Sequence, residues 1–338
     1  MKYSTVFIVP YFGSLPHQMP LFLKSCAYNS DFTWMIFTDD KSYEQFDVPK
    51  NVMFIDFSFN QFNDLLKSKF GNDVTIQSPY KLCDLKPMYG YIFEDYISKY
   101  DYWGHTDLDI VFGRIADFIS DDILERYDKL FCLGHFIIYR NTFDNNRVFM
   151  SSHKGAYIYK QVLDNPNICW FDEEWKDDNN INRIFLENGK DVLQDDFSLN
   201  FSDKHNSFKR VVYCGHDDPR SDEQGYYLED NENTRYFWSD GILFSITVAN
   251  GVMQKREYMY MHYMHRNMKI PANVASVKNL LIVPNSFIPL NHIPESLFEL
   301  NAIHYNKLNF DMTLRKYRLW FKDFPNKVSR KIRHLLGC

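Results

Sequence analysis

The sequence predicts an α/β fold in which a parallel β-sheet is flanked by helices. Three observations lead to this prediction. Short apolar runs of strand length alternate with segments of helical spacing, several runs end in acidic residues, and no run approaches the roughly 18 apolar residues of a membrane-spanning helix. Ligands in such sheets bind outside the carboxyl ends of the strands. Acidic residues at those ends are therefore candidate site residues.

The N-terminal part of the chain supplies the first elements of this sheet. We expect strands over residues 4–10, 34–40 and 51–57, and a helix over residues 21–29. A second helix is predicted over residues 87–100, because Pro87 stands in its first turn, where the missing N–H costs nothing. The next predicted strand lies within residues 100–113, YDYWGHTDLDIVFG.

The rest of the chain is more irregular. A strand pair is expected over residues 128–141, a strand or turn over residues 256–268, and a further strand over residues 279–290. Between these, the sequence up to about residue 240 is polar and predicts long loops and short elements around a groove. No linker interrupts the chain before about residue 312, so we predict one domain, residues 1–312, followed by a tail.

Composition restricts the possible functions. The 338 residues are 45% hydrophobic and 17% aromatic, which predicts an aromatic core, an aromatic-lined groove for sugar or base rings, or both. The six cysteines form no C-x-x-C pair, which argues against a zinc ribbon. The N-terminus has no signal-peptide pattern, so a soluble cytoplasmic protein is expected. The net charge is −6, with +7 in residues 313–338 and −13 elsewhere, and an acidic body disfavours nucleic acid as a partner.

Two aspartates, Asp107 and Asp109, stand one residue apart between aromatic and β-branched neighbours. In a strand they would face the same side with Cα atoms roughly 6.5–7 Å apart, and their like charges would repel. A divalent cation between the carboxylates removes this cost and can bridge two phosphate oxygens of a substrate. The alternative is a pair of solvated aspartates at a strand end, but such residues do not need apolar neighbours.

Several motifs together resemble bacterial GT-A-type glycosyltransferases encoded with capsule and lipopolysaccharide genes. They are IVPYFG, FTDD, SPYKLCDLKPMYGYIF, GHTDLDIVFG and a late Y-x-H-x-x-x-R, and the resemblance covers roughly residues 4–270. It implies a GT-A-like fold with a Rossmann-like mixed sheet. Residues 1–113 would bind a nucleotide-diphosphate sugar, a UDP-sugar, with Mn²⁺ or Mg²⁺. Residues 114–312 would face a saccharide acceptor in surface polysaccharide biosynthesis.

The resemblance also implies roles for single residues. The base would be bordered by Pro10, Tyr11 and Phe12, with Asp39 near the base or ribose, and the nucleotide sugar would be contacted by Lys81 and Asp84. The metal ligands would be Asp107, which could instead meet the ribose, Asp109 and His262, and the diphosphate would be bound by Arg266. Some relatives have Lys where this chain has His265. Histidine is mostly uncharged at neutral pH, so the sequence leaves open how tightly the diphosphate is bound.

Transfer to a sugar hydroxyl with inversion needs a carboxylate that accepts its proton, whereas retention places other demands on the site. The stretch ICWFDEEW favours Asp172 or Glu173, because Trp170 and Trp175 flank it and aromatic faces suit sugar C–H patches. Solvated loop acids are the alternative, and Asp195 and Asp196 are further candidates of the same type. Lys86 and His105, beside the motifs, are secondary candidates.

Residues 313–338 predict a basic amphipathic helical tail. Leu314, Tyr317, Phe321 and Phe324 form one helical stripe, and basic residues fill the other faces. This pattern suits an anionic membrane surface, which would fit a lipid-linked saccharide acceptor and a peripheral place on the inner face of the cytoplasmic membrane. An ordinary helix packed on the domain is the alternative.

Two other functions fit part of the sequence. Asp107 to Val111 match the D-x-D-x-V nucleophile motif of haloacid-dehalogenase-type phosphatases, although that motif normally lies near the start of its domain. A non-catalytic carbohydrate-binding protein could use the aromatic groove without any metal.

Overall fold

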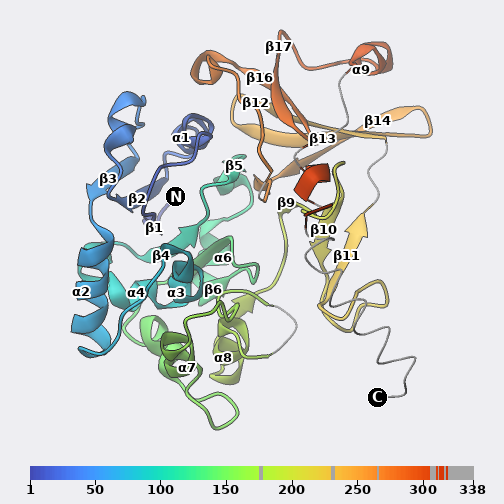
Figure 1. The fold of residues 1–338 in the computed structure, drawn as a ribbon. Helices are drawn as coiled ribbons and strands as arrows, with labels where there is room; N and C mark the ends of the chain where they lie inside the picture. Colours follow the sequence, from blue (N-terminus) through green and yellow to red (C-terminus); the bar gives the residue numbers. More distant parts are fainter. Residues whose placement is uncertain are drawn as a thin grey trace.

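The computed structural model describes residues 1–174, 178–229, 233–264 and 266–304, together with residues 310, 312–315, 317 and 318. Within these residues the chain forms a seven-stranded sheet of order β3-β2-β1-β4-β7-β6-β8 and two five-stranded sheets (Figure 1). Helices accompany the first sheet, so the predicted α/β class with a mixed sheet is confirmed. The tail beyond residue 318 lies outside the described residues.

The seven-stranded sheet has a parallel half and an antiparallel half. β1 pairs in parallel with β2 and β4, and β2 with β3, whereas β7 pairs antiparallel with β4 and β6. β8 returns parallel to β6. The strands are β1 (Thr5–Pro10), β2 (Phe32–Thr38), β3 (Val52–Asp56), β4 (Tyr102–Thr106), β6 (Lys129–Leu130), β7 (Phe136–Arg140) and β8 (Val192–Leu193). The strands predicted over 4–10, 34–40, 51–57 and 128–141 are thereby confirmed.

The helices are α1 (Met19–Ala27), α2 (Phe59–Phe70), α3 (Leu82–Leu85), α4 (Tyr89–Ile92), α5 (Glu94–Ile97), α6 (Asp121–Arg126), α7 (Ile158–Asp164), α8 (Ile181–Glu187) and α9 (Leu297–Ala302). α2 begins at a capping box in which Ser58 and Gln61 satisfy each other's backbone N–H. The single helix predicted over 87–100 is wrong. Phe93, at φ −102° and ψ 23°, interrupts it between α4 and α5, and its ring packs 4.6 Å from that of Phe37 on β2.

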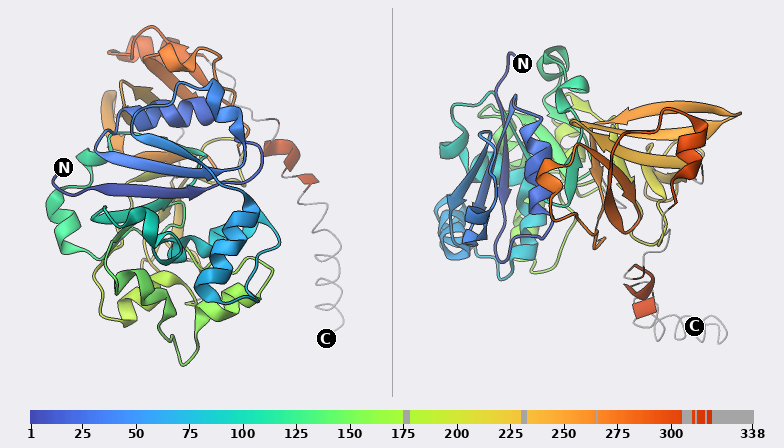
Figure 2. Two further views of the ribbon diagram at one scale, coloured as in Figure 1. Left: turned by 90° about the vertical axis from the view of Figure 1, so that its left-hand side faces the viewer. Right: turned by 90° about the horizontal axis from the view of Figure 1, so that it is seen from above.

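The other two sheets lie beside the first, and Figure 2 shows the sheet of β12, β13, β14, β16 and β17 extending from the N-terminal half when the molecule is seen from above. One contains β5 (Ile110–Phe112), β9 (Ser198–Phe201), β10 (Arg210–Tyr213), β11 (Tyr226–Glu229) and β15 (Tyr260–His262). The other contains β12 (Thr234–Ser239), β13 (Ile242–Ala249), β14 (Val252–Tyr258), β16 (Asn279–Val283) and β17 (Ser286–Leu290). The single strand predicted over 279–290 is therefore a hairpin.

Asp107 and Asp109 do not lie in one continuous strand, so that prediction is wrong. β4 ends at Thr106 in the first sheet, and β5 begins at Ile110 in the second. Both aspartates occupy the turn between them, which avoids placing two like charges inside a strand. The turn carries the chain from one sheet to the other at the carboxyl end of β4.

The core is rich in aromatic residues, as predicted. Phe7 on β1 packs against Trp34 and Phe136, and Trp103 stacks on Tyr139 with ring centroids 4.3 Å apart. In the part of the chain that the structure describes, no helix is long and apolar enough to cross a membrane.

Candidate functional site

A cavity of about 1570 Å³ opens where the first sheet meets the second. Compact ligand pockets span roughly 300–1,000 Å³, so this one has room for more than one small ligand. Among the predicted site residues it is lined by Pro10, Tyr11, Phe12, Asp107, Asp109, Asp172, Glu173, His262 and Arg266. Residues far apart in the sequence are thereby brought to one place, at the carboxyl ends of β1 and β4.

Three of these residues form a candidate metal centre. Ligand atoms of Asp107, Asp109 and His262 all lie within 4.8 Å of one another. The register of β5 and β15 pairs Ile110 with His262, which brings the imidazole Nε2 to 3.3 Å from an Asp109 carboxylate oxygen. Two carboxylates and an imidazole form a donor set that suits Mn²⁺. Mg²⁺ prefers oxygen ligands, which the two carboxylates supply. The residues present therefore fit a divalent ion.

Asn200 fixes which nitrogen of His262 faces the aspartates. Its amide oxygen, on β9, accepts a hydrogen bond of 3.2 Å from Nδ1, which leaves Nε2 as the nitrogen directed at Asp109. His135 stacks on the same imidazole at 4.3 Å between ring centroids. Burial alone would lower the pKa of His262, but the Asp109 carboxylate outweighs burial and raises it. A bound cation would therefore have to compete with a proton for Nε2.

Lys86 joins this centre to the acids of the opposite wall. Its ammonium lies 2.7 Å from a carboxylate oxygen of Asp107 and 3.3 Å from one of Asp172, and donates to the Gly134 carbonyl at 2.9 Å. Burial acts to lower the pKa of Lys86, yet the charges of Asp107 and Asp172 hold it well above its ordinary value. From the sequence, Lys86 was only a secondary candidate. His105, the other secondary candidate, is buried and lines the cavity, and burial lowers its pKa well below the ordinary value.

Asp172 and Glu173 both reach the cavity, as a general base would have to. Burial raises the pKa of Asp172 to about 6 and that of Glu173 to about 8. The Asp172 charge raises the pKa of Glu173 further, whereas the Lys86 ammonium acts to lower both pKa values. The wall behind them is tight, since a Cβ on Gly134 would lie 2.4 Å from an Asp172 carboxylate oxygen. Only glycine allows Asp172 to approach Lys86 this closely.

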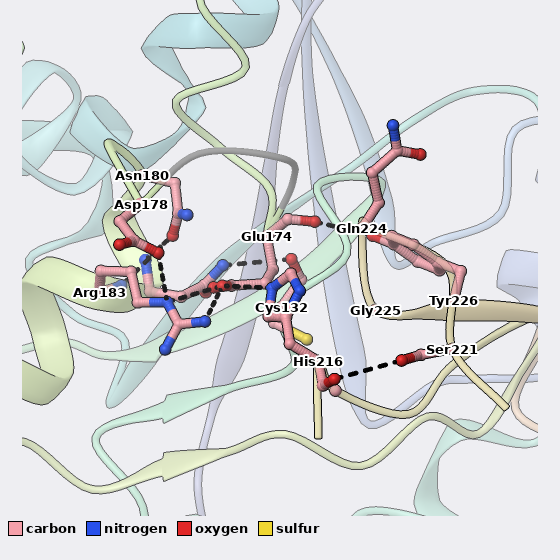
Figure 3. Close-up of polar contacts among 12 residues, drawn as sticks. Cys132, Glu174, Asp178, Asn180, Arg183, His216, Ser221, Gln224, Gly225 and Tyr226 are labelled. Atoms are coloured by element: carbon pink, nitrogen blue, oxygen red, sulfur yellow. Dashed lines mark hydrogen bonds and ion pairs between the residues drawn. The ribbon is translucent and has the colours of Figure 1, made fainter. Parts of the chain in front are cut away.

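The neighbouring acid, Glu174, does not line the cavity, and its polar contacts anchor this segment (Figure 3). Its carboxylate accepts from Nε of Arg183 on α8 at 2.7 Å, and its backbone N–H donates to the Cys132 carbonyl at 2.9 Å. The Tyr226 hydroxyl, on β11, donates to the Glu174 carbonyl at 2.8 Å. The three consecutive acids therefore have different surroundings, and the loop that carries them is fixed from two sides.

Four predicted substrate contacts have other partners in the structure. Lys81 and Asp84 do not line the cavity, and they form a buried ion pair of 2.8 Å. Asp39 does not line it either, and it accepts from the Gly13 N–H in the loop after β1. Arg266 lines the cavity, but its guanidinium donates to backbone carbonyls of residues 202, 205 and 207, and burial lowers its pKa to about 10. His265 and Trp175 lie outside the described residues.

The fold and the site together define an α/β protein with a candidate divalent-metal centre at the edge of a mixed sheet. The chain belongs to a family of unknown function (DUF6625), whose model matches residues 7–291. No curated protein matches the chain. Among solved structures, mouse xyloside xylosyltransferase 1 in its apo form is similar, with a TM-score of 0.34 and 10% identity over 59% of this chain and 88% of that one. So distant a likeness carries no functional weight, and function has to be inferred from the site.

Proposed function

We propose that this protein is a metal-dependent glycosyltransferase that moves a sugar from a nucleotide-diphosphate sugar, a UDP-sugar, to a saccharide acceptor. The observation that carries the proposal is the convergence of Asp107, Asp109 and His262 at a cavity large enough for donor and acceptor. These three residues would hold Mn²⁺ or Mg²⁺, which when bound neutralises charge on the leaving diphosphate. GT-A architecture is part of the same proposal.

Other cavity residues have chemistry that suits the remaining tasks. Tyr11 and Phe12, in the loop after β1, offer aromatic surface for a base. The Lys86 ammonium holds Asp107 and Asp172 at fixed positions on either side of it. Asp172 or Glu173 would accept the proton of the acceptor hydroxyl, and a carboxyl with a raised pKa is a stronger base than an exposed one.

The wider setting that we propose is surface polysaccharide biosynthesis in the cytoplasm, at the inner face of the cytoplasmic membrane. The basic tail, residues 313–338, would bind anionic lipid and bring the site to a lipid-linked acceptor. Deleting these residues should abolish cosedimentation with anionic vesicles, and unchanged cosedimentation would refute the membrane role.

The central test is a thermal-shift panel of nucleotides and nucleotide sugars, each with and without Mn²⁺ or Mg²⁺. We expect UDP and UDP-sugars to stabilise the protein only with metal, by about 2.7 kcal/mol at a hundredfold excess over Kd. Asp109→Asn should abolish this response, whereas Asp117→Asn, outside the cavity, should keep it.

Assays of phosphate release, saccharide binding and UDP-sugar hydrolysis separate the two rival functions from the transferase. Release of phosphate from small phosphomonoesters, without nucleotide binding, would indicate a phosphatase that uses Asp107 or Asp109. Saccharide binding that neither metal removal nor Asp109→Asn alters would indicate a carbohydrate-binding protein. Metal-dependent hydrolysis of a UDP-sugar to UDP would support the transferase.

A further inference from the structure

Trp170 differs from the other tryptophans in the described part of the chain. Trp34, Trp103 and Trp238 are fully buried, whereas Trp170 is 50% exposed and lines the cavity. Its neighbours Phe171 and Asp172 are themselves buried. Burying an indole side chain stabilises a fold through the hydrophobic effect. With Trp170 half exposed, this protein forgoes part of that stabilisation.

The backbone at Trp170 is also unfavourable. Its φ is +55°, in the left-handed region that bulky residues rarely adopt. Such a conformation costs on the order of 1–3 kcal/mol and persists only where the surroundings impose it. Exposure and backbone strain therefore coincide at one residue, and that residue faces the cavity.

The buried pair Lys81–Asp84 imposes this conformation. The Asp84 carboxylate accepts from the N–H groups of Cys169 at 2.8 Å and Phe171 at 3.2 Å, the residues on either side of Trp170. Lys81 donates to the other side of the same bend, at the Asn167 carbonyl, over 2.7 Å. These bonds hold the backbone on both sides of the indole.

The surroundings of Trp170 combine aromatic surface with carboxylates. Tyr80, next to Lys81, is 65% exposed and also lines the cavity. Asp172 and Glu173 follow Trp170 directly and reach the same cavity. A sugar ring presents an apolar C–H face and polar hydroxyls, which need an aromatic plane and nearby hydrogen-bond acceptors respectively.

We propose that Trp170 is the stacking platform for the acceptor sugar, and that Lys81 and Asp84 are the residues that position it. The inference rests on the proposed function, because the candidate bases Asp172 and Glu173 have to contact the acceptor and Trp170 adjoins them. The donor diphosphate belongs at the separate cluster of Asp107, Asp109 and His262.

The first experiment measures binding of the full chain to an array of mono- to tetrasaccharides in the presence of UDP and Mn²⁺. Trp170→Ala should weaken saccharide binding about tenfold, and Trp170→Phe should retain most of it. Phe298→Ala on α9 is the matched control, since Phe298 is 83% exposed and does not line the cavity. Equal binding by Trp170→Ala and the wild type would overturn the inference.

The outcomes also separate this inference from the proposed function. Stabilisation by UDP and Mn²⁺ without any saccharide bound would overturn the acceptor platform and leave the transferase intact. Saccharide binding that depends on Trp170, without stabilisation by UDP and metal, would sink the transferase and leave a Trp170 sugar site.

The second experiment tests whether Trp170 serves ligand binding or the stability of the fold. Trp170→Gly removes the strained side chain, so its thermal midpoint should equal or exceed that of the wild type while saccharide binding is lost. Asp84→Asn should weaken saccharide binding and leave stabilisation of the folded fraction by UDP and Mn²⁺ unchanged. A lower midpoint for Trp170→Gly, like that expected for Trp103→Gly in the core, would contradict the proposal.

Discussion

Two lysine–aspartate contacts, close together in the sequence, have opposite surroundings. Lys81 and Asp84 lie 2.8 Å apart, with side chains 4% and 0% exposed, and backbone groups of residues 167–171 surround them. Lys86 and Asp107 lie 2.7 Å apart, but the Asp107 side chain is 30% exposed and lines the cavity. The first pair is closed, and the second has an open side.

The difference indicates what each pair is for. A buried carboxylate whose oxygens are occupied by backbone N–H groups and an ammonium has little capacity left for a ligand, so it can only hold the chain in place. A carboxylate that is paired on one side and faces a cavity on the other can still bind a cation or a hydroxyl. Structural and ligand-binding carboxylates therefore differ less in the ion pair itself than in whether an oxygen is still able to bind a cation or accept a hydrogen bond.

The largest effect that tests this comparison is on stability. Asp84→Asn leaves the Lys81 charge buried without its counter-ion, so it should lower the free energy of unfolding by about 3–5 kcal/mol. Asp107→Asn, the same change in the open pair, should cost less than about 1 kcal/mol, because Asp107 is partly exposed and Lys86 keeps Asp172 as a counter-ion. Urea denaturation of both variants checks this difference, and equal losses would contradict it.

An intermediate effect is expected at Gly134, where the wall of the open pair is tightest. In Gly134→Ala the new methyl would lie 2.4 Å from the Asp172 carboxylate oxygen, and Asp172 would have to move away from Lys86. Overpacking of this kind costs about 1–3 kcal/mol of stability. Displacement of Asp172 should also reduce turnover of a UDP-sugar, and this reduction should be larger than the loss of UDP affinity. A variant with wild-type stability and turnover would show that this wall can yield freely.

The sequence predicted the parallel strands because their signals are local. The apolar runs that became β1, β2 and β3 end in residues that cannot continue a buried strand. The turn at Asp107 to Asp109 was missed because periodicity does not show that β5 leaves one sheet to pair with β15 in another. The break at Phe93 was missed for a similar reason, since packing against β2 decides it.

The site was predictable where one motif contains its chemistry and unpredictable where partners come from distant segments. Asp107, Asp109 and His262 were predicted from motifs, and the structure brings them together. Lys81, Asp84 and Arg266 were predicted as substrate contacts from the resemblance, but their bonds go to loops that no motif connects to them. Asn200, which orients His262, lies in a strand without any signal in the sequence.

The smallest expected effect sharpens the comparison through pH. Burial raises the pKa of Glu173, so the folded protein binds this proton more tightly than the unfolded chain does. As pH rises from the ordinary carboxyl range through neutral, ionisation of Glu173 therefore costs folding free energy, and Glu173→Gln should become the more stable protein by on the order of 1 kcal/mol. Denaturation at about pH 4.5 and pH 8 checks this, with exposed Glu44→Gln as control. If the stability difference between Glu173→Gln and the wild type stayed constant with pH, the cavity would have to solvate the Glu173 carboxylate as well as bulk water does.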